Sequence, residues 1–128
     1  MEIPAGLTEL ARETFYSGHL QRVTFTEGSR LERVERSAFE STRLETFAAP
    51  PSLRVICSQA FYHCGGLKEV ILNEGLETLG ADHEEGLCGV FQYTSIERVC
   101  LPSTLLEIGN FTFHHCQRLG RLDLPAGL

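Results

Sequence analysis

Two short apolar patterns alternate along the chain and recur together about five times. The first is L-x-x-[LVF]-x-[LFA], and its opening residues are Leu20, Leu44, Leu67, Ile96 and Leu119. The second is L-x-x-[LVI], followed by a phenylalanine. The openers of the first pattern recur every 23 or 24 residues, with one spacing of 29. A fixed period in the low twenties is typical of a solenoid, in which each unit buries its apolar face only against its neighbours.

The unit at residues 96–116 is the clearest, and its apolar positions match those of the other units one by one. Its phenylalanine belongs to a column that is present in every unit, at Phe15, Phe39, Phe61, Phe91 and Phe113. Because each unit must fill its interior with its own apolar side chains, we expect this column to be buried. Phe61, near the middle of the array, should be a core residue.

Alternation along a strand places the apolar residues of the first pattern inside and the residues between them outside. The outward residues form two predicted rows. One row is Arg22, Thr46, Glu69, Arg98 and Arg121, and the other is Thr24, Ala48, Ile71, Cys100 and Asp123. Arginines at the rim of an apolar strip suit a polypeptide partner that carries carboxylates. These ten residues are the predicted partner-binding surface; a merely solvated sheet face is the alternative, and the outward Ile71 favours binding.

The pattern L-x-x-[VL]-x-L-P-x-x-L-x-x-I-G-x-x-x-F-x-x-C, complete at 96–116 and partial at 53–64 and 119–128, resembles the BspA-like (Treponema pallidum-type) leucine-rich repeats. The resemblance implies an α/β repeat solenoid. This would be a curved right-handed stack, with a parallel sheet on the concave side and short helical or turn segments carrying the phenylalanine on the convex side. It also implies a surface or secreted protein that adheres to other proteins.

Several units depart from this pattern. The place of the cysteine holds Gly18, Thr42 and Thr94, and the Ile-Gly place reads Val34-Glu35 and Ile56-Cys57 in two units. Two irregularities in length add to this, a two-residue bulge at 27–30 and an insertion of seven residues within 81–89. Insertions in a solenoid fall on loops, because stacked strands cannot absorb them.

The whole of residues 1–128 is predicted to be one leucine-rich-repeat domain whose terminal units are partial. The chain starts and stops at the same point of the repeat, since Pro4-Ala5-Gly6-Leu7 near the start matches Pro125-Ala126-Gly127-Leu128 at the end. Solenoids close their cores with polar capping units. We therefore expect a segment of a longer array, a truncated chain, or ends that another molecule covers. Uncovered ends would self-associate or fray.

Composition restricts the partner and leaves the location open. The net charge is −6 with mixed signs, which argues against nucleic acid, because phosphate binding favours a positive stripe. No apolar run approaches the roughly 18 residues of a membrane span, so no insertion by this segment is expected. The first residues lack the pattern of a secretory signal. The family resemblance favours a surface or secreted location, whereas five cysteines, an odd number, favour a reducing compartment or a fragment.

Histidines and cysteines form a pattern that suggests zinc without supporting it. His63-Cys64 and His114-His115-Cys116 occupy equivalent places two units apart, hence about 10 Å apart for strands stacked at about 4.8 Å. Zinc requires ligands at roughly 2.0 to 2.3 Å, so one ion cannot reach both groups. Cys64 and Cys116 are better interpreted as small buried packing residues.

The insertion carries Asp82, Glu84 and Glu85, which could contact a cation, but their spacing lacks the alternating oxygens and turn glycine of an EF-hand loop. A solvated loop is the favoured interpretation, and an ion-binding or enzymatic site is the less favoured one. The chain has no hydrolase, phosphate-loop or zinc-protease motif, so we predict no catalytic residues, no metal and no cofactor. Asn110-Phe111-Thr112 fits a glycosylation acceptor, although a turn asparagine is favoured.

The sequence thus favours a non-catalytic protein-interaction or adhesion module whose protein partner it does not identify. A structural spacer within a larger surface protein remains the alternative.

Overall fold

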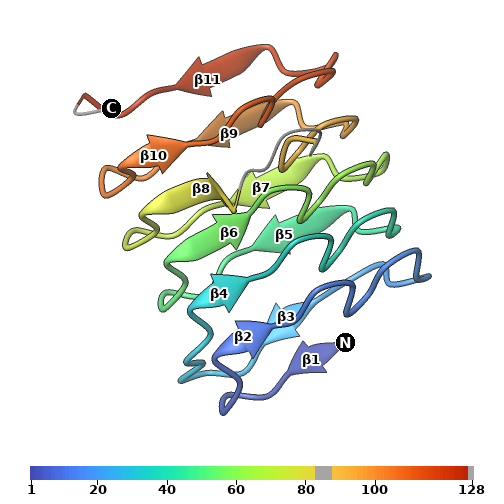
Figure 1. Cartoon of the computed structure of the whole chain (residues 1–128), viewed down its shortest axis with the longest axis vertical. Helices are drawn as coiled ribbons and strands as arrows, with labels where there is room; N and C mark the ends of the chain where they lie inside the picture. The colour runs from blue at the N-terminus through green and yellow to red at the C-terminus, as the bar shows by residue number, and fades with distance from the viewer. Residues whose placement is uncertain (83–87, 127–128) are drawn as a thin grey trace.

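Each repeat contributes two short strands, one from each apolar pattern, in the computed structural model, which describes residues 1–82 and 88–126 (Figure 1). The first pattern forms β3 (Thr24–Phe25), β5 (Thr46–Ala48), β7 (Glu69–Ile71), β9 (Arg98–Cys100) and β11 (Arg121–Asp123), and β1 (Glu2–Ile3) precedes them. The second pattern forms β2 (Glu9–Leu10), β4 (Arg33–Val34), β6 (Val55–Cys57), β8 (Thr78–Ala81) and β10 (Glu107–Ile108).

The strands pair in parallel and run on two sides of the stack. The second pattern gives one continuous five-stranded sheet in the order β10-β8-β6-β4-β2. The first pattern gives a four-stranded sheet, β11-β9-β7-β5, and a separate pair, β1-β3. The predicted parallel solenoid is therefore confirmed, and the stack has about five turns (Figure 1).

The phenylalanine column lies in the core, as the sequence predicts. The rings stack from Phe15 through Phe39, Phe61 and Phe91 to Phe113, with centroid separations of 5.0 to 5.9 Å. The three central rings are fully buried, and the two terminal rings are partly buried. Strand residues such as Phe47 and Val70 point inward beside this column and complete the apolar interior.

Helical or turn segments are predicted to carry the phenylalanines, and the helical alternative is wrong, because the structure has no helix within residues 1–82 and 88–126. The second pattern forms a sheet, and the phenylalanines sit in turns that contain left-handed residues such as Gln59 and His63, with φ of 62° and 60°. A right-handed helix cannot continue through such residues. Part of the turn backbone instead forms hydrogen bonds with the next turn of the solenoid, or rung. For example, the Phe61 N–H donates to the Val90 carbonyl at 3.0 Å. The expected α/β class is therefore correct in its strands and wrong in its helices.

The two irregularities of length have different outcomes. The bulge at 27–30 is a turn after β3, in which Gly28 adopts a φ of 81°. The expected insertion begins at the end of β8, and residues 83–87 lie outside the described residues, together with 127–128. Among the described residues, none belongs to a helix long and apolar enough to cross a membrane.

Candidate functional site

Eight of the ten residues in the two predicted rows lie on the exposed side of the sheet β5-β7-β9-β11, which we call the candidate face. Across neighbouring strands Thr46 is in register with Glu69, and Arg98 is in register with both Glu69 and Arg121. The second row is in register between Ala48 and Ile71 and between Cys100 and Asp123. All ten predicted residues are exposed. Their role in binding stays a prediction.

Two of the ten residues are not joined to the others. Arg22 precedes β3 and Thr24 begins it, and β3 pairs with β1 but not with β5. The candidate face thus consists of eight of the predicted residues on four hydrogen-bonded strands, and Arg22 and Thr24 lie beyond a break in the sheet.

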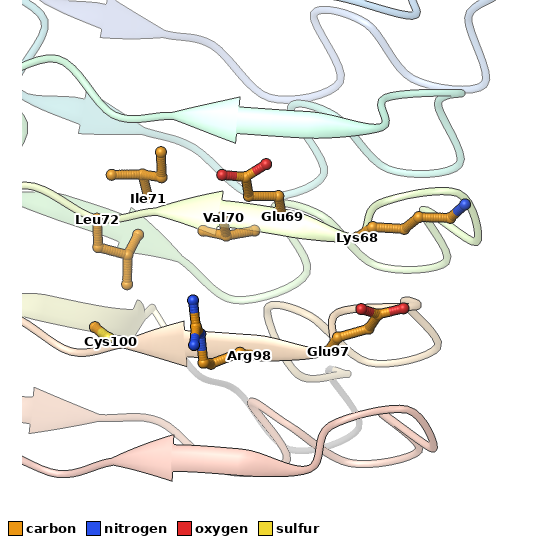
Figure 2. Close-up of a pocket in the computed structure, with 8 residues that line it drawn as sticks. All are labelled: Lys68, Glu69, Val70, Ile71, Leu72, Glu97, Arg98 and Cys100. Carbon is orange, nitrogen blue, oxygen red and sulfur yellow. The ribbon is translucent and has the colours of Figure 1, made fainter.

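A cavity of about 540 Å³ opens between β7 and β9 on the candidate face (Figure 2). The two strands share a single registered pair, Glu69 with Arg98, whereas β5 and β7 share three. Ile71, Leu72, Arg98 and Cys100 are among the residues that line the cavity, and Ile71 keeps 56% of its surface exposed. Where the ladder is reduced, the two strands thus border a hollow of mixed character, with Ile71 and Leu72 beside the charged Lys68, Glu69, Glu97 and Arg98.

The arginines of the face differ in their electrostatic partners. Arg121 pairs with Asp123 at 3.1 Å, and the Cys100 thiol donates to the same carboxylate at 3.7 Å. Within residues 1–82 and 88–126, Arg98 has no ion pair with any acidic side chain, including Glu69 in the neighbouring strand. Arg98 is consequently available to a carboxylate from outside, at the border of the hollow.

A polar cluster that sequence reasoning missed lies across the three central strands of the other sheet, β4, β6 and β8. Arg33 pairs with both Glu35 and Asp82, and the Cys57 thiol donates to Asp82 at 3.5 Å and to Glu35 at 3.8 Å. The signal was present in the sequence, because Glu35 and Cys57 replace the glycine of the Ile-Gly place in two successive units.

One oxygen of Glu35, one oxygen of Asp82 and the Cys57 sulfur lie within 4.8 Å of one another, a spacing that suits a metal ion. The Arg33 guanidinium already pairs with both carboxylates and offsets one of their two negative charges. Burial is the main cause that raises the pKa of the Cys57 thiol to about 12, and the neighbouring carboxylates add to the shift. Since the thiolate is the form that attacks electrophiles and binds metals, Cys57 is a protonated hydrogen-bond donor here.

The histidine and cysteine groups occupy the places that the repeat predicts. Tyr93 lies between His63 and His115, with ring centroids 5.7 and 4.7 Å from theirs. Cys64 and Cys116 are buried, and each thiol donates to a backbone carbonyl at 3.0 Å. Burial raises the pKa of both thiols, which fits packing residues rather than nucleophiles.

Parallel rungs, two strands per repeat and a buried phenylalanine column define a solenoid of leucine-rich repeats. The chain belongs to the family described as the BspA type leucine rich repeat region, which matches residues 1–83 and 88–128 in six copies. None of the curated proteins matches the sequence.

Solved structures agree on the fold. The crystal structure of the pneumococcal vaccine antigen PcpA has 26% identity and a TM-score of 0.87 over 98% of this chain and 30% of that chain. A leucine-rich cell surface protein from Faecalibacterium prausnitzii has 22% identity and a TM-score of 0.64, over 94% of this chain and 37% of that one. A leucine-rich-repeat protein from Bacteroides ovatus has 21% identity and a TM-score of 0.70, over 99% of this chain and 37% of that one. This chain thus spans about a third of the length of each.

Proposed function

We propose that the chain is a non-catalytic module that binds a polypeptide partner on the candidate face. The observation that carries the proposal is the exposed Ile71 beside the hollow between β7 and β9, together with Arg98, which has no ion pair among the described residues. Removing the exposed part of an isoleucine side chain from water contributes about 1 to 2 kcal/mol. A neighbouring arginine adds orientation and association rate for an acidic partner.

The test compares two matched aspartate substitutions in a binding assay with a partner captured by the immobilised chain. Ile71→Asp places a carboxylate in the contact area, where it loses water without gaining a partner. We expect binding to weaken by about tenfold or more, which corresponds to about 1.4 kcal/mol. Leu106→Asp is the control, because Leu106 is 76% exposed and lies next to β10 on the other sheet. It should leave the affinity within about twofold.

Two results would contradict the proposal. If neither Ile71→Asp nor Arg98→Ala changes any interaction of the parent protein, the chain is a structural spacer. If substitutions of His83 and Glu84 abolish binding while Ile71→Asp is silent, the insertion at 81–89 is the site. Under the proposal, Arg98→Ala should act mainly on the association rate and on its dependence on salt.

A surface location is a further part of this proposal. It is supported by the resemblance to BspA-like repeats and by the pneumococcal antigen with the same fold. Against it stand five free cysteines, which suit a reducing compartment. Antibody labelling of intact cells separates the two locations, and labelling that requires permeabilised cells would refute the surface.

A further inference from the structure

The sheet formed by the first pattern is broken between β3 and β5. β1 pairs with β3, and β5 pairs with β7, but no pair joins β3 to β5. On the opposite side the corresponding strands β4 and β6 remain in register. The two successive turns of the solenoid that carry β3 and β5 are still bonded before β3 begins, where the Arg43 N–H donates to the Leu20 carbonyl at 3.1 Å. They are no longer paired at β3 and β5 themselves. The turn at 27–30, which is two residues longer than in the other units, comes directly after β3, so the opening coincides with an irregular unit of the sequence.

The break leaves backbone groups of β5 without strand partners. The Ala49 N–H donates to the Ile71 carbonyl of β7 at 2.9 Å. Successive peptide groups of a strand point to opposite sides, so the N–H groups of Ala48 and Thr46 point toward β3. Within residues 1–82 and 88–126, the structure has no hydrogen bond between β3 and β5. β5 therefore has a free edge inside the stack.

A cleft of about 720 Å³ opens at the end of this free edge, beside Ala48 and the segment that follows β5. Its lining is largely apolar and includes Val23, Phe25, Ala48, Ala49 and Pro50. The Phe25 and Phe47 rings meet edge to face with centroids 5.9 Å apart, so apolar surface continues between the two rungs. The volume lies within the range of about 300 to 1,000 Å³ that is usual for binding pockets.

We propose that this cleft receives an extended peptide segment of a partner protein, which adds to the free edge of β5 as a strand. The free donor of Ala48 lies in the lining of the cleft, and that of Thr46 lies two residues earlier on the same edge, a spacing that matches the hydrogen-bonding repeat of an extended chain. Main-chain bonds would supply affinity, and alternate apolar side chains of the peptide would contact Phe25 and Val23. The inference rests on the proposed function for the class of partner, but the cleft is separate from the hollow beside Ile71.

Amide hydrogen exchange tests the free edge directly. In the unbound chain the Ala48 amide should exchange much faster than the adjacent Ala49 amide, because only Ala49 is bonded to a neighbouring strand. The probe is a synthetic acetylated hexapeptide with the sequence of residues 68–73, since β7 in that segment already pairs with the other edge of β5. A saturating amount of this peptide should slow exchange at Ala48 and leave Ala49 unchanged. Equal protection of both amides in the unbound chain would overturn the inference.

A pair of substitutions at one position tests the contact. Ala48→Pro removes the donor that faces the cleft, and proline is tolerated where a strand N–H is not bonded. Ala48→Thr keeps the donor and is the control. We expect Ala48→Pro to weaken binding of the hexapeptide about three- to tenfold, the effect of losing one hydrogen bond, and Ala48→Thr to leave it within about twofold. Both variants should melt at the temperature of the parent chain.

The same assay separates this inference from the proposed function. Ile71→Asp should not change hexapeptide binding if the peptide lies in the cleft. If Ile71→Asp abolishes that binding and Ala48→Pro does not, the peptide lies on the candidate face, and the cleft inference fails while the proposed function stands. If Ile71→Asp leaves the affinity for the natural partner unchanged while Ala48→Pro weakens binding of the hexapeptide, the proposed function fails and the cleft inference stands. No binding at about 1 mM peptide, equivalent to about −4 kcal/mol, would also overturn the inference.

Discussion

Replacement of Phe61 by alanine tests the repeat register at its centre. Phe61 is fully buried, and its ring stacks between Phe39 at 5.0 Å and Phe91 at 5.4 Å and contacts Phe47 at 4.7 Å. Emptying a buried phenylalanine site costs about 3 to 5 kcal/mol. Because the ring has aromatic neighbours on three sides, and such pairs add about 0.5 to 1.5 kcal/mol each, we expect a loss at the upper end of that range.

Urea unfolding followed by circular dichroism measures the loss, and Phe15→Ala is the matched control. Phe15 occupies the same column but is only partly buried, and its one stacked neighbour is Phe39 at 5.4 Å. Its removal should cost about 1 to 2 kcal/mol, because partial burial leaves less transfer free energy to lose. A cost below about 1 kcal/mol for Phe61→Ala would refute a continuous buried column, as would equal costs for the two variants.

Two further predictions concern the other sheet. Gly80→Ala should destabilise the chain by more than about 1 kcal/mol, because Gly80 has a φ of 103° and an added Cβ would lie 2.8 Å from the Gly109 backbone. Gly65→Ala, with nothing within 4 Å of its Cβ, is the control and should stay within about 0.5 kcal/mol in the same unfolding assay. Burial raises the pKa of the Cys57 thiol from 9.0 to about 12, so the folded state disfavours the ionised thiolate. The free energy of unfolding that the parent chain gains over Cys57→Ala should therefore be present below about pH 9 and be lost as the pH rises to about 12. An advantage that does not change with pH over that window would contradict this reasoning, as would alkylation of Cys57 as fast as that of the exposed Cys100 in the native chain at pH 8.

Alternation and period predicted the parts of the structure that depend on one strand at a time. The inward positions of Val70 and Phe47 and the outward positions of Ile71 and Arg98 follow from a repeat of two residues along a strand. The phenylalanine column follows in the same way, since equal unit lengths place equivalent residues above one another. The binding role assigned to the outward rows depends on a partner and remains a prediction.

The second sheet was missed because its sequence pattern does not alternate. The apolar residues of L-x-x-[LVI] are three positions apart, a spacing that also fits one face of a helical turn, although the strands are as long as those of the first pattern. The left-handed residues that exclude a helix, such as Ser37 and Ser41, are ordinary residue types and not glycines. Nothing in their identity indicates a positive φ, which the bonds to the neighbouring rung hold in place.

The cluster around Arg33 needed contacts between rungs that a single unit does not reveal. Glu35 and Cys57 were recognisable as departures from glycine, but Asp82 joins them only because β6 and β8 shift register between Ile56 and Cys57. A shift of this kind changes which side chains meet without changing the apolar pattern. Sequence could therefore show where the repeat departs from its family, but not which departures touch.

The break between β3 and β5 and the reduced pairing between β7 and β9 both occur on the side of the solenoid formed by the first pattern, and the pairing of the other sheet explains why the stack tolerates them. The sheet of the second pattern is paired without a break from β2 to β10, so it holds the rungs in order. Extra residues follow β3 at 27–30, and the ladder between β3 and β5 is absent there; between β7 and β9 the ladder is reduced to one pair. A solenoid with two sheets can thus keep one ladder closed for stability while the other opens at irregular units. The opening between β3 and β5 exposes apolar side chains beside a free backbone edge, which is the combination that a bound polypeptide segment requires.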